Sequence, residues 1–220
     1  MKLQSLPPTI SYDELISLFT VRSGNALYLE PALGTGSVKR FYLEKGLQAR
    51  LWDCSFYDDL EMHTSFKQIQ AKQHFTIAYF FDGKELKFAK GMTPFRKSMW
   101  CDHMFLSAIS DYRLLVPRFV RLHCLSISFS MNWVNTILNK NAALANVKEK
   151  IQGPGILSLA GTMELSEREQ IAHLKSEAEK YTGSFFIKCS ILQIISNFFC
   201  KLNDQDKFFT SNHRRLTGAV

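Results

Sequence analysis

Hydrophobic and polar positions alternate with a two-residue period through residues 26–129. This period is typical of strands with one buried face. The clearest examples are ALYLE, VKRFYLEKG, LQARLWDCSF, HFTIAYFF and VRLHCLSISF. Asp82-Gly83 has the chemistry of a two-residue hairpin turn, and Gly46 predicts a bulge or tight turn. Many short strands with tight connections indicate an antiparallel barrel or sandwich rather than a parallel sheet.

The period changes to that of a helix after Ser130. Ser130 is a suitable N-cap for MNWVNTILNK. Ser166 and Glu169 have the spacing of a capping box at the start of a second helix, which Gly183 can end. Another helix follows over 184–202, so these two should form an antiparallel hairpin. We therefore expect an α+β fold, divided into an arm (1–25), a barrel (26–160), a helix hairpin (164–202) and a tail without periodicity (203–220).

The helix expected over 184–202 has two apolar faces instead of one. One face holds Ile187, Ile191, Ile194, Ile195, Phe198 and Leu202, and the other holds Phe185, Cys189, Leu192, Phe199 and Cys200. A surface helix needs only one apolar stripe. The pattern predicts a homodimer, with an interface formed by Ile191, Leu192, Ile195, Phe198 and Phe199. The alternative is a helix that its own chain covers on both sides.

Composition and charge bear mainly on partners and compartment. The net charge is +7, but the charges are scattered. The one cluster, Lys84, Lys87, Lys90, Arg96 and Lys97, suits a solvated strand edge better than a nucleic-acid site. The five cysteines lack CxxC spacing, which is typical of buried thiols in a reducing compartment. Without a signal peptide or a long uninterrupted apolar run, the chain is expected to be cytoplasmic and free of membrane contact.

Three segments together resemble one family of regulators. GLQARLWDCSFYDD, FTIAYFFDGKEL and SEREQIAHLKSEAEKYTGSFFIKCSILQIISNFF follow in the order of the N-terminal sensor and dimerisation domain of AraC-family transcription regulators. The resemblance covers roughly residues 26–202. It implies a cupin-like barrel that binds a small organic effector and a helix hairpin that forms the dimer. DNA contact is expected only through a C-terminal domain with two helix-turn-helix units, which has no counterpart after Leu202.

The candidate chemistry points to binding rather than catalysis. There is no HxH pair, no GxSxG motif and no phosphate-binding loop, so we expect no catalytic, metal or cofactor site and no enzyme. Cys101 and His103 with His63 or His123 could form a mixed zinc site, but packed core residues are the more common case.

A ligand inside the barrel would meet the face of each strand that lines it. The residues predicted to contact it are Trp52, His63, Tyr79, Phe81, Met99 and His103. The alternative for each is that its ring simply fills the core. Two other functions also remain open at this point: a stand-alone cupin-type enzyme, such as an isomerase or metal-dependent oxygenase, and a non-catalytic module of another barrel family.

Overall fold

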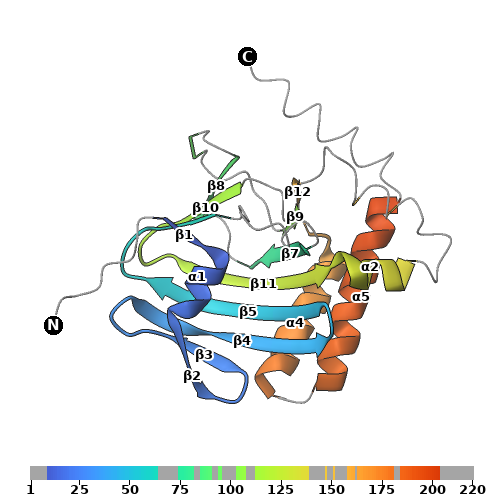
Figure 1. The fold of residues 1–220 in the computed structure, drawn as a ribbon, viewed down its shortest axis with the longest axis horizontal. Helices are drawn as coiled ribbons and strands as arrows, with labels where there is room; N and C mark the ends of the chain where they lie inside the picture. Colours follow the sequence, from blue (N-terminus) through green and yellow to red (C-terminus); the bar gives the residue numbers. More distant parts are fainter. Residues whose placement is uncertain are drawn as a thin grey trace.

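The computed structural model describes residues 9–63, 74–81, 85–90, 94–95, 103–107, 112–138, 147, 151, 158–161, 163–180 and 184–203. The fold is α+β, an antiparallel cupin-like β-barrel of two sheets followed by a C-terminal helix hairpin (Figure 1). The expected fold class is confirmed. Met99, Cys101 and the turn residues Asp82 and Gly83 lie outside the described residues.

The larger sheet has eight strands. In spatial order they are β12 (Ser158–Gly161), β9 (His103–Ser107), β7 (His74–Phe80), β11 (Arg121–Ser130), β5 (Leu47–Phe56), β4 (Gly34–Glu44), β3 (Ala26–Leu29) and β2 (Phe19–Ser23). The smaller sheet has the order β1 (Thr9–Ser11), β6 (Leu60–His63), β10 (Tyr112–Val116) and β8 (Lys87–Lys90). Neighbouring strands are antiparallel, except that β1 runs parallel to β6.

Both faces of the large sheet are buried, against different partners. Its inner face and the small sheet enclose an apolar core that includes Val38, Trp52 and Phe80. Its outer face packs against α2 (Met131–Leu138), α4 (Leu165–Lys180) and α5 (Ser184–Asn203) through a second core that includes Ile77, Phe105 and Phe129. Because side chains alternate between the two faces of a strand, each long strand contributes to both cores.

Local sequence explains several of the element boundaries. The Ser130 hydroxyl accepts a hydrogen bond from the Trp133 amide at 3.2 Å, which confirms the predicted N-cap of α2. Gly46, at a φ of 84°, joins β4 to β5, and the register shifts just before it, so this turn is also confirmed. The predicted capping box, Ser166 with Glu169, lies two residues too far along the chain. In the structure the Glu167 carboxylate accepts a hydrogen bond from the Glu164 amide at 2.9 Å, and α4 begins at Leu165.

Two predictions about chain organisation are wrong. Residues 9–25 do not form an arm, because β1 is a strand of the small sheet and β2 is a strand of the large sheet. The intervening α1 (Tyr12–Ser17) places Leu15 in the inner core, and the start of β2 adds Phe19 to it. The strands on either side of Asp82-Gly83 do not form a hairpin either. β7 pairs within the large sheet and β8 within the small one, so the chain crosses between sheets there.

The helix hairpin is present and antiparallel. Near the end of α5, Lys201 Nζ lies 2.7 Å from the Glu167 carboxylate at the start of α4, and the Asn197 amide donates to the Gln170 side chain at 3.0 Å. The predicted helices are therefore confirmed, with bounds close to those expected from the sequence.

The predicted interface on α5 needs correction. Ile191, Ile195, Phe198 and Phe199 are each at most 4% exposed, and Leu192 is partly buried against the same core. These side chains pack on the outer face of the large sheet, as Phe198 does against Phe105 with ring centroids 5.0 Å apart. The periodicity of α5 could not show which partner covers its apolar surface, because the sequence pattern is the same whether a sheet of the same chain or a second copy packs against it.

Candidate functional site

The predicted ligand-contacting residues do not converge on one site. Trp52 lies in the inner core, whereas Tyr79 and Phe81 lie on the outer face, beneath the helices. His103 pairs directly with Tyr79 across β9 and β7, so it shares that outer face. His63 lies on the small sheet, 3.5 Å from Glu61. The prediction of one pocket for this set is therefore wrong, because it placed the apolar side of β7 inside the barrel.

The outer-face residues serve packing. The Phe81 ring lies 4.4 Å from the His123 ring, and the Lys175 ammonium lies 5.9 Å from its centroid. Burial raises the pKa of the Tyr79 hydroxyl well above its ordinary value, so this group is protonated at neutral pH. The hollow between this face and the helices is lined mostly by apolar side chains and has room for about one water molecule. It is too small for a metabolite.

The inner face of the large sheet changes character along its strands. The register defines three successive rows of side chains that cross β4, β5, β11 and β7. The first row is Val38, Trp52, Cys124 and Phe80. The second is Arg40, Arg50, Ser126 and Ala78. The third is Tyr42, Gln48, Ser128 and Thr76. The barrel interior is thus apolar at one end and polar and basic at the other.

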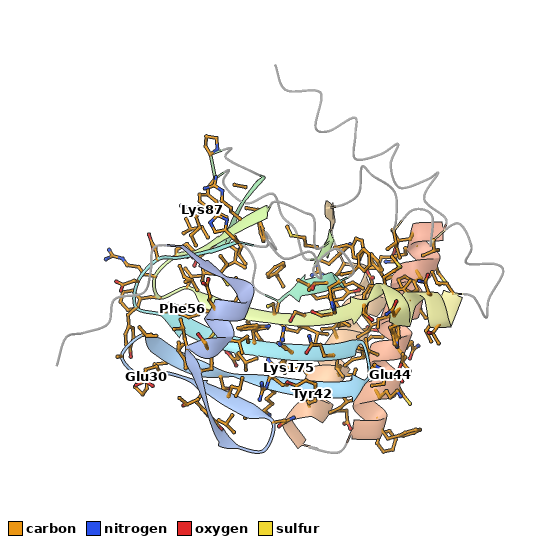
Figure 2. All side chains as sticks on the ribbon, in the orientation of Figure 1. Glu30, Tyr42, Glu44, Phe56, Lys87 and Lys175 are labelled. Atoms are coloured by element: carbon orange, nitrogen blue, oxygen red, sulfur yellow. The ribbon has the colours of Figure 1, made fainter. Side chains whose placement is uncertain are left out.

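The first row is already filled by the chain itself. Its four side chains are at most 5% exposed. Burial raises the pKa of the neighbouring Cys54 thiol to about 12, so this group is protonated at neutral pH and is no nucleophile. Arg40, Arg50, Gln48, Thr76 and Ser128 are only partly buried, and Tyr42 is exposed. Figure 2 shows Phe56 toward the end of the sheet that α1 covers and Tyr42 nearer the helix hairpin.

Arg40 and Arg50 dominate the polar end. They occupy directly paired positions on β4 and β5, so their side chains leave the same face of the sheet. The Arg40 guanidinium lies 5.7 Å from the Tyr42 ring, and its buried Nε has no hydrogen-bond partner among the described residues. The Arg50 guanidinium contacts the Gln48 side-chain oxygen at 3.5 Å. This pairing therefore brings two positive charges together at the polar end of the inner face.

Hydroxyl groups continue the polar surface beside the arginines. The Trp52 indole N–H donates to the Ser126 hydroxyl at 3.0 Å, and the Thr76 and Ser128 hydroxyls lie 3.0 Å apart. These contacts fix hydroxyl oxygens on two neighbouring strands. With two guanidinium groups next to them, the arrangement is suited to bind an anion that also carries hydrogen-bonding groups.

Sequence reasoning missed this surface, although the signal was present. In LQARLWDCSF, Gln48 and Arg50 share a strand face with Trp52, Cys54 and Phe56. The other face of the same strand begins with Leu47, Ala49 and Leu51. When both faces of a strand are mostly apolar, a polar stretch on one of them indicates a polar surface within the fold. The predicted ligand site was based mainly on aromatic residues and therefore did not include this polar surface.

Two further features bear on metal and membrane contact. Within the described ranges, His, Cys, Asp and Glu side chains form no group of three or more that could hold a metal ion. By length and composition, the Phe185–Leu202 part of α5 is apolar enough to cross a membrane. Packing of its inner face in the outer core accounts for that composition.

Comparisons with known proteins give likeness of fold only. No protein-family model and no curated protein matches the sequence. The apo form of a ToxT variant from Vibrio cholerae strain SCE256 is 12% identical with a TM-score of 0.44, and the match covers 74% of this chain. This chain spans only 57% of that protein. An RmlC-like cupin from Shewanella frigidimarina NCIMB 400 is 15% identical with a TM-score of 0.29, covering 51% of this chain and 81% of the cupin. Both TM-scores are below 0.5, so the function proposed below depends on this chain's own residues.

Proposed function

We propose that this chain is a non-catalytic domain that binds a small organic effector and dimerises, as the sensor half of an AraC-type transcription regulator. DNA contact in the parent protein would belong to a separate domain. The proposal includes a cytoplasmic location, which suits the free thiols of Cys54, Cys124, Cys189 and Cys200.

The observation that carries the proposal is the polar and basic end of the barrel interior. Small barrels are usually filled with apolar side chains, and here the first row of the inner face follows that rule. The next two rows place Arg40, Arg50 and Gln48 at partly accessible positions, beside the buried Ser126 and the partly buried Thr76 and Ser128. A fold that needed only stability would gain nothing from this arrangement. A few polar groups that converge at the mouth of a barrel are typical of a ligand site.

The helix hairpin suits the role of transmitting ligand binding. It packs on the outer face of the strands whose inner face carries the arginines. The Glu44 carboxylate at the end of β4 accepts a hydrogen bond from Lys188 of α5 at 2.6 Å and another from the Trp133 indole of α2. These bonds hold the pKa of Glu44 below its ordinary value. A shift of β4 on ligand binding would therefore reach α5 directly, as a two-state sensor requires.

A dimer through α5 would have to use its exposed face. That face is formed by Phe185, Phe186, Cys189, Gln193, Ser196 and Cys200. Phe185 and Phe186 are 71% and 70% exposed, with ring centroids 5.9 Å apart. Charged substitutions at Ile195 or Phe199 would disrupt folding and would say nothing about association.

The regulator proposal has two separable tests. Ligand binding is tested by the melting temperature of the 220-residue chain against a metabolite library, since a ligand specific for the folded state raises it. Dimerisation is tested by fusing the chain to a DNA-binding domain that represses a reporter only as a dimer. We expect repression by the wild type and its loss in Phe185→Glu/Phe186→Glu. A matched control, Arg118→Glu, changes an exposed residue in the turn before β11, which contacts Asp59 instead of α5. Failure of the wild-type fusion to repress would contradict the dimer, and a library without any stabilising compound would contradict the sensor.

A further inference from the structure

We propose that the effector is a small polar organic anion whose carboxylate or phosphate group is bound by Arg40 and Arg50 inside the barrel. This deepens the proposed function and rests on it. The site consists of the second and third rows of the inner face. Arg40 and Arg50 would bind the anionic group, and Gln48, Thr76 and Ser128 would contact the polar remainder of the ligand.

The two arginines occupy directly opposite positions on β4 and β5. Like charges at directly opposite positions of an antiparallel pair destabilise a sheet. The same-face neighbours of this pair on the described strands are Val38, Tyr42, Gln48, Trp52 and Ser126, and none of them is acidic. An anion beside the Arg40 guanidinium would offset the repulsion between the two positive charges.

The Arg40 side chain has an unsatisfied hydrogen-bond donor. Its Nε is buried without a hydrogen-bond partner among the described residues, and its guanidinium lies over the Tyr42 ring. A buried donor without an acceptor is unfavourable, so such atoms are rare in folded proteins. An oxyanion is the natural acceptor, because a guanidinium presents a planar fork of N–H groups that matches two oxygens of a carboxylate or phosphate.

The neighbouring rows limit the rest of the ligand. Val38 and Trp52 are fully packed next to the arginines, so a long apolar chain would have to displace the core. The opposite side of the pair offers an amide and hydroxyl groups at Gln48, Thr76 and Ser128. These groups recognise hydroxyls or further oxygens. The geometry therefore favours a short hydroxy acid or a small phosphorylated metabolite over a lipid or a neutral sugar.

Thermal melting of the full chain with citrate or inorganic phosphate as probe, against chloride at equal ionic strength, tests the proposal. Citrate reports a carboxylate ligand and phosphate reports a phosphorylated one. We expect at least one probe to raise the melting temperature, with a shift that grows with the logarithm of its concentration. Arg40→Gln should weaken binding at least about tenfold while melting in chloride no lower than the wild type. Arg50→Lys should bind more weakly than the wild type, because it keeps the charge but loses the fork.

The control variant is Arg118→Gln, which removes an exposed arginine outside the site. General stabilisation by excluded salts would raise all variants equally, and an equal shift in Arg40→Gln would overturn the anion proposal. A neutral library compound that stabilises wild type and Arg40→Gln alike would also overturn it but leave the sensor function intact. If neither the anions nor any library compound stabilises the chain, both proposals fail together.

Discussion

Phe198→Ala tests whether the inner face of α5 belongs to the chain's own core. Phe198 is 4% exposed, and its ring centroid lies 5.0 Å from that of Phe105 and 6.2 Å from that of Phe199. Burial of a phenylalanine side chain contributes about 1.5–3 kcal/mol, and aromatic contacts add about 0.5–1.5 kcal/mol. The truncation also leaves a cavity, so we expect a loss of about 3–5 kcal/mol in the free energy of unfolding.

Urea denaturation at two protein concentrations measures this loss and its origin. The matched control is Leu165→Ala at the start of α4, where the side chain is 73% exposed and lies outside the proposed dimer face, and the expected loss is about 0.5 kcal/mol or less. A core residue destabilises by the same amount at both concentrations. A residue in an interface between copies destabilises by an amount that depends on protein concentration.

Two results would refute this assignment. One is a cost of Phe198→Ala no larger than that of Leu165→Ala. The other is a cost that disappears when the protein is diluted, since dilution separates copies but leaves the packing within a chain unchanged. Either result would restore the inner face of α5 as the place where two copies meet.

Three further predictions follow from individual contacts. Gly36→Ala should lower stability by about 2 kcal/mol or more, seen as a lower urea midpoint, because φ is 115° and the new Cβ would lie 2.2 Å from the Asp53 carbonyl oxygen. Asp53→Asn should cost no more than about 1 kcal/mol at pH 7, because the bonds from Arg121 that lower the pKa of Asp53 are largely exposed to solvent. That stability is fully present above the ordinary pKa of 3.8 and is lost as the pH falls through the lowered value, so the gap between variant and wild type should close in acid melts. Finally, in a protein solution dilute enough to separate the copies, a maleimide at pH 7 should label the exposed Cys189 quickly and the buried Cys54 slowly, as peptide mass spectrometry would show; equal rates would contradict the assigned burial.

Local patterns were enough to predict elements but not their partners. The alternation in LQARLWDCSF predicted β5, and the Ser130 hydroxyl predicted the start of α2, because both signals act within a few residues. Asp82-Gly83 predicted a hairpin on equally sound local grounds. It was wrong because β7 and β8 gain more from pairing in different sheets than from pairing with each other.

The candidate site shows the same division between local and distant information. The sequence shows that Arg50 and Trp52 share one face of β5, and that Leu51 lies on the other. Both faces of that strand carry apolar residues, so the sequence cannot tell which face lines the barrel. The inner surface was consequently assigned to Tyr79 and His103, which the structure places beneath the helices.

Near-neighbour signals in the sequence were sufficient to predict strands, helices and a hairpin at the end of the described chain, because periodicity and capping act over a few residues. Which apolar surfaces pack against each other depends on contacts between segments that are distant in the sequence. The free energy of hydrophobic burial is proportional to the buried area and has no direction. The apolar faces of α5 therefore did not reveal that the outer face of the large sheet is their packing partner. The register between β4 and β5, set by the whole sheet, is what brings Arg40 opposite Arg50.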